Sequence, residues 1–216
     1  MALSKVNFNS LNVTPAASKA IKFNSSNNGI ETGDVGGSMV LLSTTTASSS
    51  ATVDITSNID STYKEYIIKF IDVHPATDSA MLQFQVDTGT NTSYNQTITS
   101  TNFNAVHNQD GSETVLAYRT ARDLAQSTSF QPITEGADNE NDSCVAGTLH
   151  LFDPSNQYRV KHFISTTQSV INTVDTRETF CAGYVNTTTA LTRIRFKFNS
   201  GNIDAGTFKL YGIKDS

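Results

Sequence analysis

The stretch RIRFKFNSGNIDAGTFKLYGI, from Arg193 to Ile213, decides the fold class of this chain. Apolar residues alternate with basic or polar residues in both halves, and a turn rich in Gly, Asn and Asp separates the halves. The apolar members are Ile194, Phe196, Phe198, Phe208 and Leu210. Alternation with a period of two places every second side chain on the same face of a strand. The stretch therefore predicts a two-stranded β-hairpin with one apolar face, which closes a core, and one basic face.

The composition of the whole chain favours strands joined by turns. Of its 216 residues, 37% are hydrophobic and only 16% are charged, and Ser, Thr and Asn dominate the polar remainder. Thr suits a pleated surface, whereas Asn and Ser suit turns. Further alternating runs, bounded by turn signals, predict strands at Lys19–Phe23, Ser38–Ser43, Ala51–Thr56, Tyr66–Phe70, Leu82–Val86, Gly147–Phe152, Tyr158–Ser165 and Thr179–Val185.

The segments between these runs complete the predicted architecture. Asn27–Gly37 and Ser43–Ala51 are predicted loops because they are rich in Gly, Asn or Ser. Ser112–Gln126 is predicted to be a strand and then a loop, with a short helix as the alternative because Ala, Leu and Arg favour helices. The sequence therefore predicts an all-β fold, an antiparallel β-sandwich of jelly-roll type. Residues 38–216 would form one domain, and residues 1–37 an N-terminal arm or early strands packed on it.

The net charge, the N-terminal residues and the cysteines restrict the partners and the compartment that we expect for this chain. The net charge of −5 gives no electrostatic case for binding nucleic acid or an anionic membrane. The first residues, MALSKVNFNS, do not have the pattern of a secretory signal, and no apolar stretch approaches transmembrane length. We therefore expect folding in a reducing cytosol, where Cys144 and Cys181 would be two buried thiols rather than a disulfide.

The sequence contains no catalytic motif that we recognise. A nucleophile elbow, a P-loop and a dinucleotide-binding glycine motif are all absent from it. The histidines are His74, His107, His150 and His162, and none has metal-ligand spacing. His150 and His162 fall on consecutive predicted strands and could hold zinc with Cys144, but ordinary strand-face positions are the expected reading. No catalytic residue is predicted, and the chain is not expected to be an enzyme.

The acidic segment EGADNENDS, Glu135–Ser143, is the one place where a metal is considered. Asp138, Glu140 and Asp142 stand at alternate positions with Asn and Ser between them, and such oxygen ligands suit calcium. The segment lacks the glycine and the distal glutamate of an EF-hand loop. A solvated acidic loop without any ion is therefore the expected state, and Asp138, Glu140 and Asp142 are the calcium candidates.

The basic face of the terminal stretch supplies the candidates for partner binding. They are Arg193, Arg195 and Lys197, with Lys209 across the predicted hairpin. Such a face could bind phosphate, an acidic glycan or an acidic patch of a neighbouring subunit. The alternative is an ordinary solvated strand face, or charges that protect an edge strand from aggregation. Because like charges on one face repel, carboxylates are expected across from them.

Several longer phrases together carry a resemblance to known proteins. They are Asn12–Asn24, Asp34–Val86, Gly147–Asn156 and Leu191–Lys214, which include the loop HPATDS and the closing SGNIDAGTFKLYGI. In these phrases the chain resembles the β-rich virion structural proteins of tailed bacteriophages, especially phages of marine cyanobacteria. The resemblance thins between Asn95 and Asp142. Its motifs are strand and turn motifs, so no catalytic residue is carried over.

This resemblance implies a non-enzymatic β-sandwich of a phage particle, as a head decoration, a tail-fibre component or a similar appendage. It implies assembly in the host cytoplasm, other virion proteins as partners, and a symmetric homo-oligomer, often a trimer. The alternative function is a carbohydrate-binding module that recognises a receptor glycan at a fibre tip. That module would use surface tyrosines and the acidic segment, with or without calcium. A hydrolase of surface polysaccharide has the least support.

Overall fold

A computed structural model describes residues 19–34, 37–171 and 174–215 of the chain. Its contacts divide the chain into two compact units, Met1–Ser38 and Met39–Ser216. In the first unit, β1 (Lys19–Phe23) and β2 (Ile30–Asp34) pair as an antiparallel sheet. The predicted strand Lys19–Phe23 is confirmed, whereas the predicted loop is wrong over Ile30–Asp34, because pairing with β1 extends this Gly-containing segment. The remainder of the predicted arm, residues 1–18 and 35–36, lies outside the described residues.

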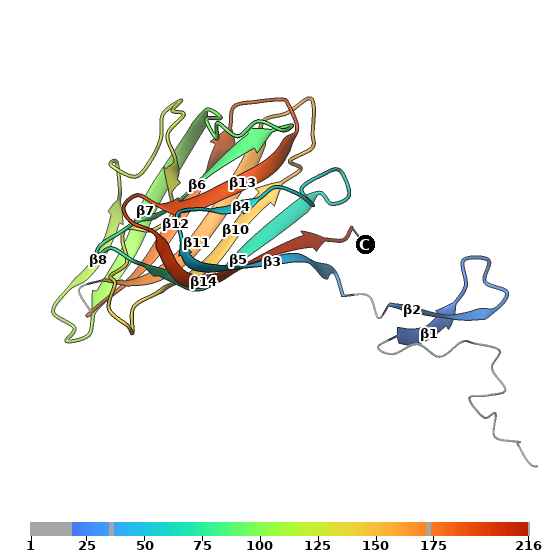
Figure 1. The fold of residues 1–216 in the computed structure, drawn as a ribbon, viewed down its shortest axis with the longest axis horizontal. Coiled ribbons are helices and arrows are strands. Elements are labelled where there is room, and N and C mark those ends of the chain that lie inside the picture. The colour runs from blue at the N-terminus through green and yellow to red at the C-terminus, as the bar shows by residue number, and fades with distance from the viewer. Residues whose placement is uncertain (1–18, 35–36, 172–173, 216) are drawn as a thin grey trace, which may run out of the picture. The chain divides into compact units, whose positions relative to one another are not determined.

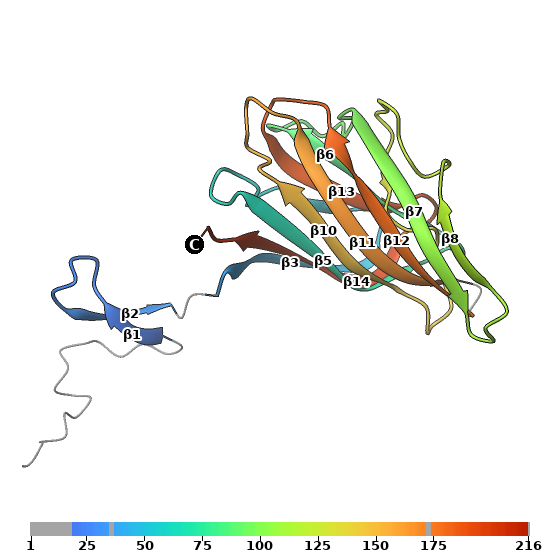
Figure 2. The same ribbon diagram turned by 180° about the vertical axis from the view of Figure 1, so that it is seen from behind.

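The second unit is built from two antiparallel sheets (Figures 1 and 2). The larger sheet has eight strands in the order β3-β14-β5-β10-β11-β12-β7-β8, and the smaller has four in the order β4-β13-β6-β9. The strands are β3 (Met39–Ser50), β4 (Val53–Ile55), β5 (Glu65–Pro75), β6 (Leu82–Thr88), β7 (Ile98–Asn108), β8 (Thr114–Tyr118), β9 (Gln131–Pro132), β10 (Val145–Phe152), β11 (Lys161–Ile171), β12 (Asp175–Val185), β13 (Leu191–Phe198) and β14 (Ile203–Ile213). The predicted all-β, antiparallel sandwich is confirmed.

The strand order bears on the predicted jelly-roll type. Four pairs of consecutive strands are divided between the sheets, with one strand in the larger sheet and the other in the smaller. They are β3/β4, β5/β6, β9/β10 and β13/β14. They form two matching quartets, β3-β14-β5-β10 and β4-β13-β6-β9. A jelly roll arranges eight strands as two Greek keys in two facing sheets. The strands β11, β12, β7 and β8 extend the larger sheet beyond its quartet, and the jelly-roll type stays a prediction.

Aromatic side chains from both sheets meet in the core. Phe196 of β13 lies edge-on to Phe70 of β5, with ring centroids 5.3 Å apart, and Phe70 lies 5.6 Å from Phe208 of β14. Phe84 of β6 packs edge-on against Phe163 of β11 at 5.0 Å. All five rings are buried. Burial of one such side chain stabilises the fold by roughly 1.5–3 kcal/mol, so these rings hold the two sheets together.

The terminal stretch is not the predicted two-stranded hairpin. β13 pairs with β4 and β6, whereas β14 pairs with β3 and β5, so the two strands lie in opposite sheets. The connection between them is tied to the β5–β6 connection, because the Asn199 amide donates to the Met81 carbonyl and the Ala76 amide to the Asn202 carbonyl. Gly201 has a positive φ of 69°, and an added Cβ there would collide with the Thr77 side chain. The alternation was interpreted correctly, but the pairing was not.

Two further predictions, for Ser43–Ala51 and Ser112–Gln126, have different outcomes. The predicted loop Ser43–Ala51 is wrong, because β3 continues through Ser50 in register with β14. The segment Ser112–Gln126 is a strand, β8, followed by an irregular connection, as predicted, and the helix alternative is wrong. The strands β7 and β9 were not predicted.

Candidate functional site

The basic residues of β13 lie on the outer face of the smaller sheet, but they do not form an open basic surface. Arg195 stands directly opposite Asp54 of β4. Its Nε donates to Asp54 Oδ1 at 2.7 Å and its Nη2 donates to Oδ2 at 2.5 Å. The carboxylate raises the pKa of Arg195 above its ordinary value. We call Arg193, Arg195 and Lys197 the basic stripe. The expectation that a carboxylate faces it is confirmed at Arg195.

A loop between β6 and β7 covers the stripe from outside. The Tyr94 side chain is buried, and the Arg195 guanidinium lies 4.1 Å from the centroid of its ring. The Tyr94 amide donates to Asp87 Oδ2 at 2.8 Å, and Gln96 Nε2 donates to Asp87 Oδ1 at 3.1 Å. Asp87 stands directly opposite Arg193 in the register of β6 and β13. The loop is therefore fastened to a buried carboxylate.

A second connection covers the rest of this face. Gln85 of β6 is buried, and its Nε2 donates to the carbonyl oxygens of Gln96, Thr128 and Ser129. Lys197 Nζ lies 4.6 Å from the centroid of the Phe130 ring. The β6–β7 and β8–β9 connections therefore both contact this face, and each places an aromatic ring beside a basic residue of β13.

Lys209 does not belong to this group. It lies on β14 in the larger sheet, directly opposite Lys69 of β5. The prediction that Lys209 lies across a hairpin from Arg193, Arg195 and Lys197 is wrong, because β13 and β14 belong to different sheets. The four residues do not share one surface, and their role in partner binding stays a prediction.

The acidic segment gathers carboxylates in a different combination from the predicted one. The ligand atoms of Asp78, Asp138 and Glu140 all lie within 4.8 Å of one another. Asp138 is buried, and Ser79 Oγ donates to its Oδ1 at 3.3 Å. Asp142 instead lines a separate pocket of about 370 Å³. Three carboxylates supply oxygen ligands of the kind calcium takes, and Asp78 comes from a part of the chain that sequence spacing did not connect with them.

The pocket beside Asp142 brings together the residue types of a thiol hydrolase, but not their geometry. It is lined by His74, Cys144 and Asp204. His74 Nε2 lies 3.0 Å from the Glu140 carbonyl oxygen and Nδ1 lies 3.6 Å from Asp204 Oδ2, so both ring nitrogens already have neighbours. Burial raises the pKa of the Cys144 thiol, the opposite of what a nucleophilic thiolate needs. The arrangement does not support nucleophilic catalysis.

His150, His162 and Cys181 are held in structural positions. His150 Nδ1 lies 2.7 Å from Glu65 Oε1, and His162 packs near the Tyr184 ring. Neither histidine joins a group of three metal ligands in the part of the chain that the structure describes. Both cysteines are free thiols, as predicted, although only Cys181 is fully buried, and burial raises its pKa to about 12.

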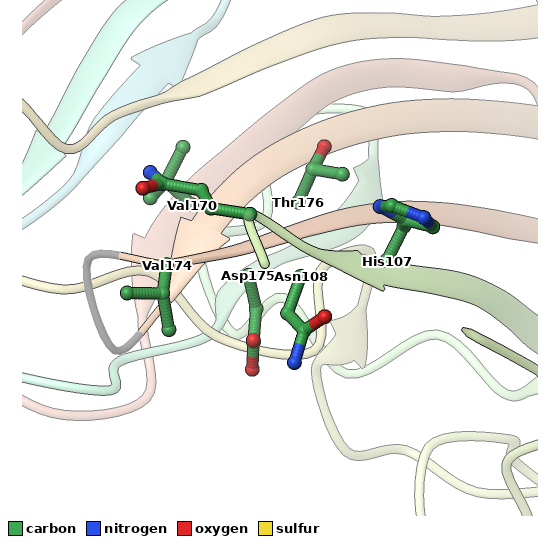
Figure 3. Close-up of a pocket in the computed structure, with 7 residues that line it drawn as sticks. His107, Asn108, Val170, Val174, Asp175 and Thr176 are labelled. Carbon is green, nitrogen blue, oxygen red and sulfur yellow. The ribbon is translucent and has the colours of Figure 1, made fainter. Parts of the chain in front are cut away.

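A small pocket at one end of β7, β11 and β12 is shown in Figure 3. It measures about 140 Å³. The side chains of Asn108 and Asp175 point to the opposite side of the sheet from that of Thr176 (Figure 3). Asn108 bonds to Ser112, and Asp175 accepts from Arg177 Nη2 at 3.3 Å. These polar groups do not converge on one point, so the pocket offers no catalytic arrangement.

The surface that sequence reasoning missed lies on the outer side of β11, β12, β7 and β8. We call it the outer apolar face and define it by Ile164, Phe180, Phe103, Leu116 and Tyr118. The exposed fractions of Ile164, Phe103, Leu116 and Tyr118 are 50%, 40%, 74% and 53%. The Phe103 and Phe180 rings stack 4.8 Å apart with an interplanar angle of 12°. The alternation within TNFNAVH (101–107) was the available signal, because Phe103 and Ala105 share one side of the strand. It was obscured because Thr101 and His107 lie on that same side and Asn102 and Asn104 on the other.

No family model, curated protein or solved structure matches this chain. Within the described ranges, no helix is long and apolar enough to cross a membrane.

Proposed function

We propose that this chain is a non-enzymatic structural protein of a tailed-bacteriophage virion that acts through protein–protein assembly. It would serve as a head decoration or as a component of a tail or fibre appendage. The resemblance of its strand and turn phrases suggests the family, and the outer apolar face is the observation that carries the assembly function. Contiguous exposed apolar patches on a soluble protein mark interaction surfaces.

The proposed partners are other virion proteins and further copies of the chain, with a trimer as the favoured homo-oligomer. Assembly takes place in the host cytoplasm and the mature protein resides in the virion. The polar candidates are consistent with this function. Asp54 neutralises Arg195, Tyr94 covers it, and the His74 nitrogens have close neighbours within the chain. In the described residues, the groups that could perform chemistry are thus largely engaged in holding the fold.

Imaging of phage particles tests the proposal directly. An antibody raised against the purified chain, carried on gold particles, is applied to intact virions from a lysate of the phage that encodes it. Label on the particles is the expected result, and its place on head or tail separates a decoration from an appendage. Unlabelled particles in a lysate that contains the soluble chain would refute a virion location.

The alternative function, glycan recognition at a fibre tip, draws on the Asp78, Asp138 and Glu140 group. If these carboxylates hold calcium for glycan binding, calcium should raise the melting temperature, and glycan-array signals should disappear in a chelator. An Asp138→Asn variant should lose both effects. A melting temperature that does not respond to calcium, together with no signal on the glycan array, would refute glycan recognition through this carboxylate group.

A further inference from the structure

We infer that Arg119 and Arg122 form a binding site for a phosphate or sulfate group. They lie on the connection that follows β8, at a small pocket of about 260 Å³. The pocket is lined by Tyr118, Arg119, Thr120, Ala121, Arg122 and Glu135. Such a site is independent of the proposed assembly function, because it depends only on the charges and hydrogen-bond donors of this pocket.

The backbone of the connection holds the two arginines in one place. The Arg122 amide donates to the Arg119 carbonyl at 2.9 Å, which closes a turn between them. The Arg119 amide donates to the Asn102 carbonyl of β7 at 2.8 Å. The buried Gln131 of β9 donates from Nε2 to the Arg122 carbonyl at 2.9 Å. Because the turn is fastened to strands of both sheets, a ligand would not have to order it on binding.

A buried carboxylate positions both guanidinium groups and leaves one positive charge over. The Glu135 side chain is only 4% exposed, and Arg119 Nη2 donates to its Oε2 at 2.7 Å. Arg122 Nε lies 3.4 Å from Oε1. Asp123 follows in the sequence, but its carboxylate accepts from the Tyr118 hydroxyl at 2.6 Å and forms no ion pair with either arginine among the described residues. Two positive charges therefore face one negative charge at the pocket.

Most N–H groups of the two guanidinium groups are not used within the described part of the chain. A guanidinium group has five N–H donors. Arg119 donates one side-chain hydrogen bond, to Glu135, and Arg122 donates one, from Nη1 to the Ala121 carbonyl at 3.3 Å. Both side chains are partly open to solvent, with exposed fractions of 34% and 27%. Their other donors are therefore available to an anion.

The number of donors favours phosphate or sulfate over a carboxylate. The two oxygens of a carboxylate match the fork of one guanidinium group, whereas phosphate and sulfate have further oxygens that can accept from a second one. The net charge of −5 opposes a long polyanion such as nucleic acid, which would lie along much of the surface. A single phosphate or sulfate group meets mainly the local charge of Arg119 and Arg122.

A nuclear magnetic resonance titration of the ¹⁵N-labelled full chain tests the site. Sodium phosphate replaces sodium chloride at constant pH and ionic strength, so that general screening does not change. Saturable shifts should appear at residues 118–122 and 135. The dissociation constant should be about 1–10 mM, because two partly exposed side chains supply only a few charge-assisted hydrogen bonds. Sulfate should bind similarly, and acetate at least tenfold more weakly.

Variants of Arg122 separate the site from a general effect of charge. Arg122→Gln retains the hydrogen bond between Arg119 and Glu135, so it should fold, and it should weaken phosphate binding at least tenfold. Arg122→Lys keeps the charge near the buried carboxylate but lacks the planar fork, so it should also lose affinity. Arg159→Gln is the matched control, because it removes the same charge from an exposed residue outside the pocket.

Saturable phosphate shifts confined to the pocket, lost in Arg122→Gln and retained in Arg159→Gln, support the site. Shifts that do not saturate would overturn it, and so would unchanged binding in Arg122→Gln, equal loss in both variants, or acetate binding as tight as that of phosphate. Methyl phosphate distinguishes the sources of the group. Binding equal to that of inorganic phosphate supports a phosphate carried by a larger molecule, and binding of inorganic phosphate alone supports the free ion.

Discussion

Replacing Arg195 and Asp54 by alanine, singly and together, tests whether the basic stripe is a structural clamp. The two charge-assisted hydrogen bonds of 2.7 Å and 2.5 Å join side chains that are each 27% exposed. Hydrogen bonds to charged groups contribute roughly 1.5–3 kcal/mol net in such settings. Because most of the pair is shielded from water, we expect a coupling energy of about 2 kcal/mol between the two sites. Each single variant should lose about 2–4 kcal/mol, since it leaves the other charge poorly solvated.

The assay is urea unfolding followed by circular dichroism, which suits a chain without tryptophan. The ion pair of Lys64 and Asp153 is the matched control, because its Nζ–Oδ1 distance is 3.1 Å but the side chains are 63% and 34% exposed. Exposed pairs contribute roughly 0.2–1 kcal/mol, so the control cycle should give a much smaller coupling. A coupling for Arg195 and Asp54 below about 0.5 kcal/mol, or no larger than the control, would refute the clamp and reopen the stripe as a binding surface.

Three further predictions concern the interior. Phe196→Asp should abolish soluble folding, because Phe196 is fully buried between the sheets, and a normal circular-dichroism melt of this variant would contradict the assigned register. Asn104→Leu combined with Thr179→Val should raise the free energy of unfolding by about 1–2 kcal/mol, since neither side chain has a hydrogen-bond partner among the described residues, and a lower melting temperature would contradict this prediction. Burial lowers the pKa of Lys161 below 10.5. The unfolded chain therefore binds more protons between the lowered pKa and 10.5, and stability should rise with pH through that window. Lys161→Met should remove this rise in urea titrations, and an unchanged pH profile would assign it to another group.

The sequence predicts which side of a strand is buried, but it does not predict which strands pair with each other. Ile194, Phe196 and Phe208 are buried as their alternation predicted. Alternation reports only which side of a strand is covered, and it is the same whether the next strand pairs with it or crosses to a facing sheet. The crossing at Gly201 depends on contacts with Thr77 and Met81, more than a hundred residues away in the chain. Such contacts leave no local pattern in the sequence.

The candidate site shows the same limit. The sequence predicted that carboxylates would face the basic stripe, and Asp54 does so because opposite charges on neighbouring strands stabilise each other. It did not predict that Tyr94 would cover Arg195, because a loop residue carries no periodic signal. Arg193, Arg195 and Lys197 were therefore interpreted as an open surface, whereas Asp54 pairs with Arg195 and the Tyr94 ring covers it.

The missed strand β7 explains why the outer apolar face also escaped prediction. Its inward residues Ser100, Asn102 and Asn104 are polar yet buried, and its outward Phe103 is 40% exposed. This is the reverse of an ordinary half-buried strand. The inward side is polar because a polar segment of the same chain covers it, as the 2.6 Å hydrogen bond from Ser100 to Gln131 indicates. The outward side is mixed, because Phe103 and Ala105 are apolar whereas Thr99, Thr101 and His107 are polar. Neither side of β7 is uniformly apolar, so the strand has no clean alternating pattern from which it could be predicted.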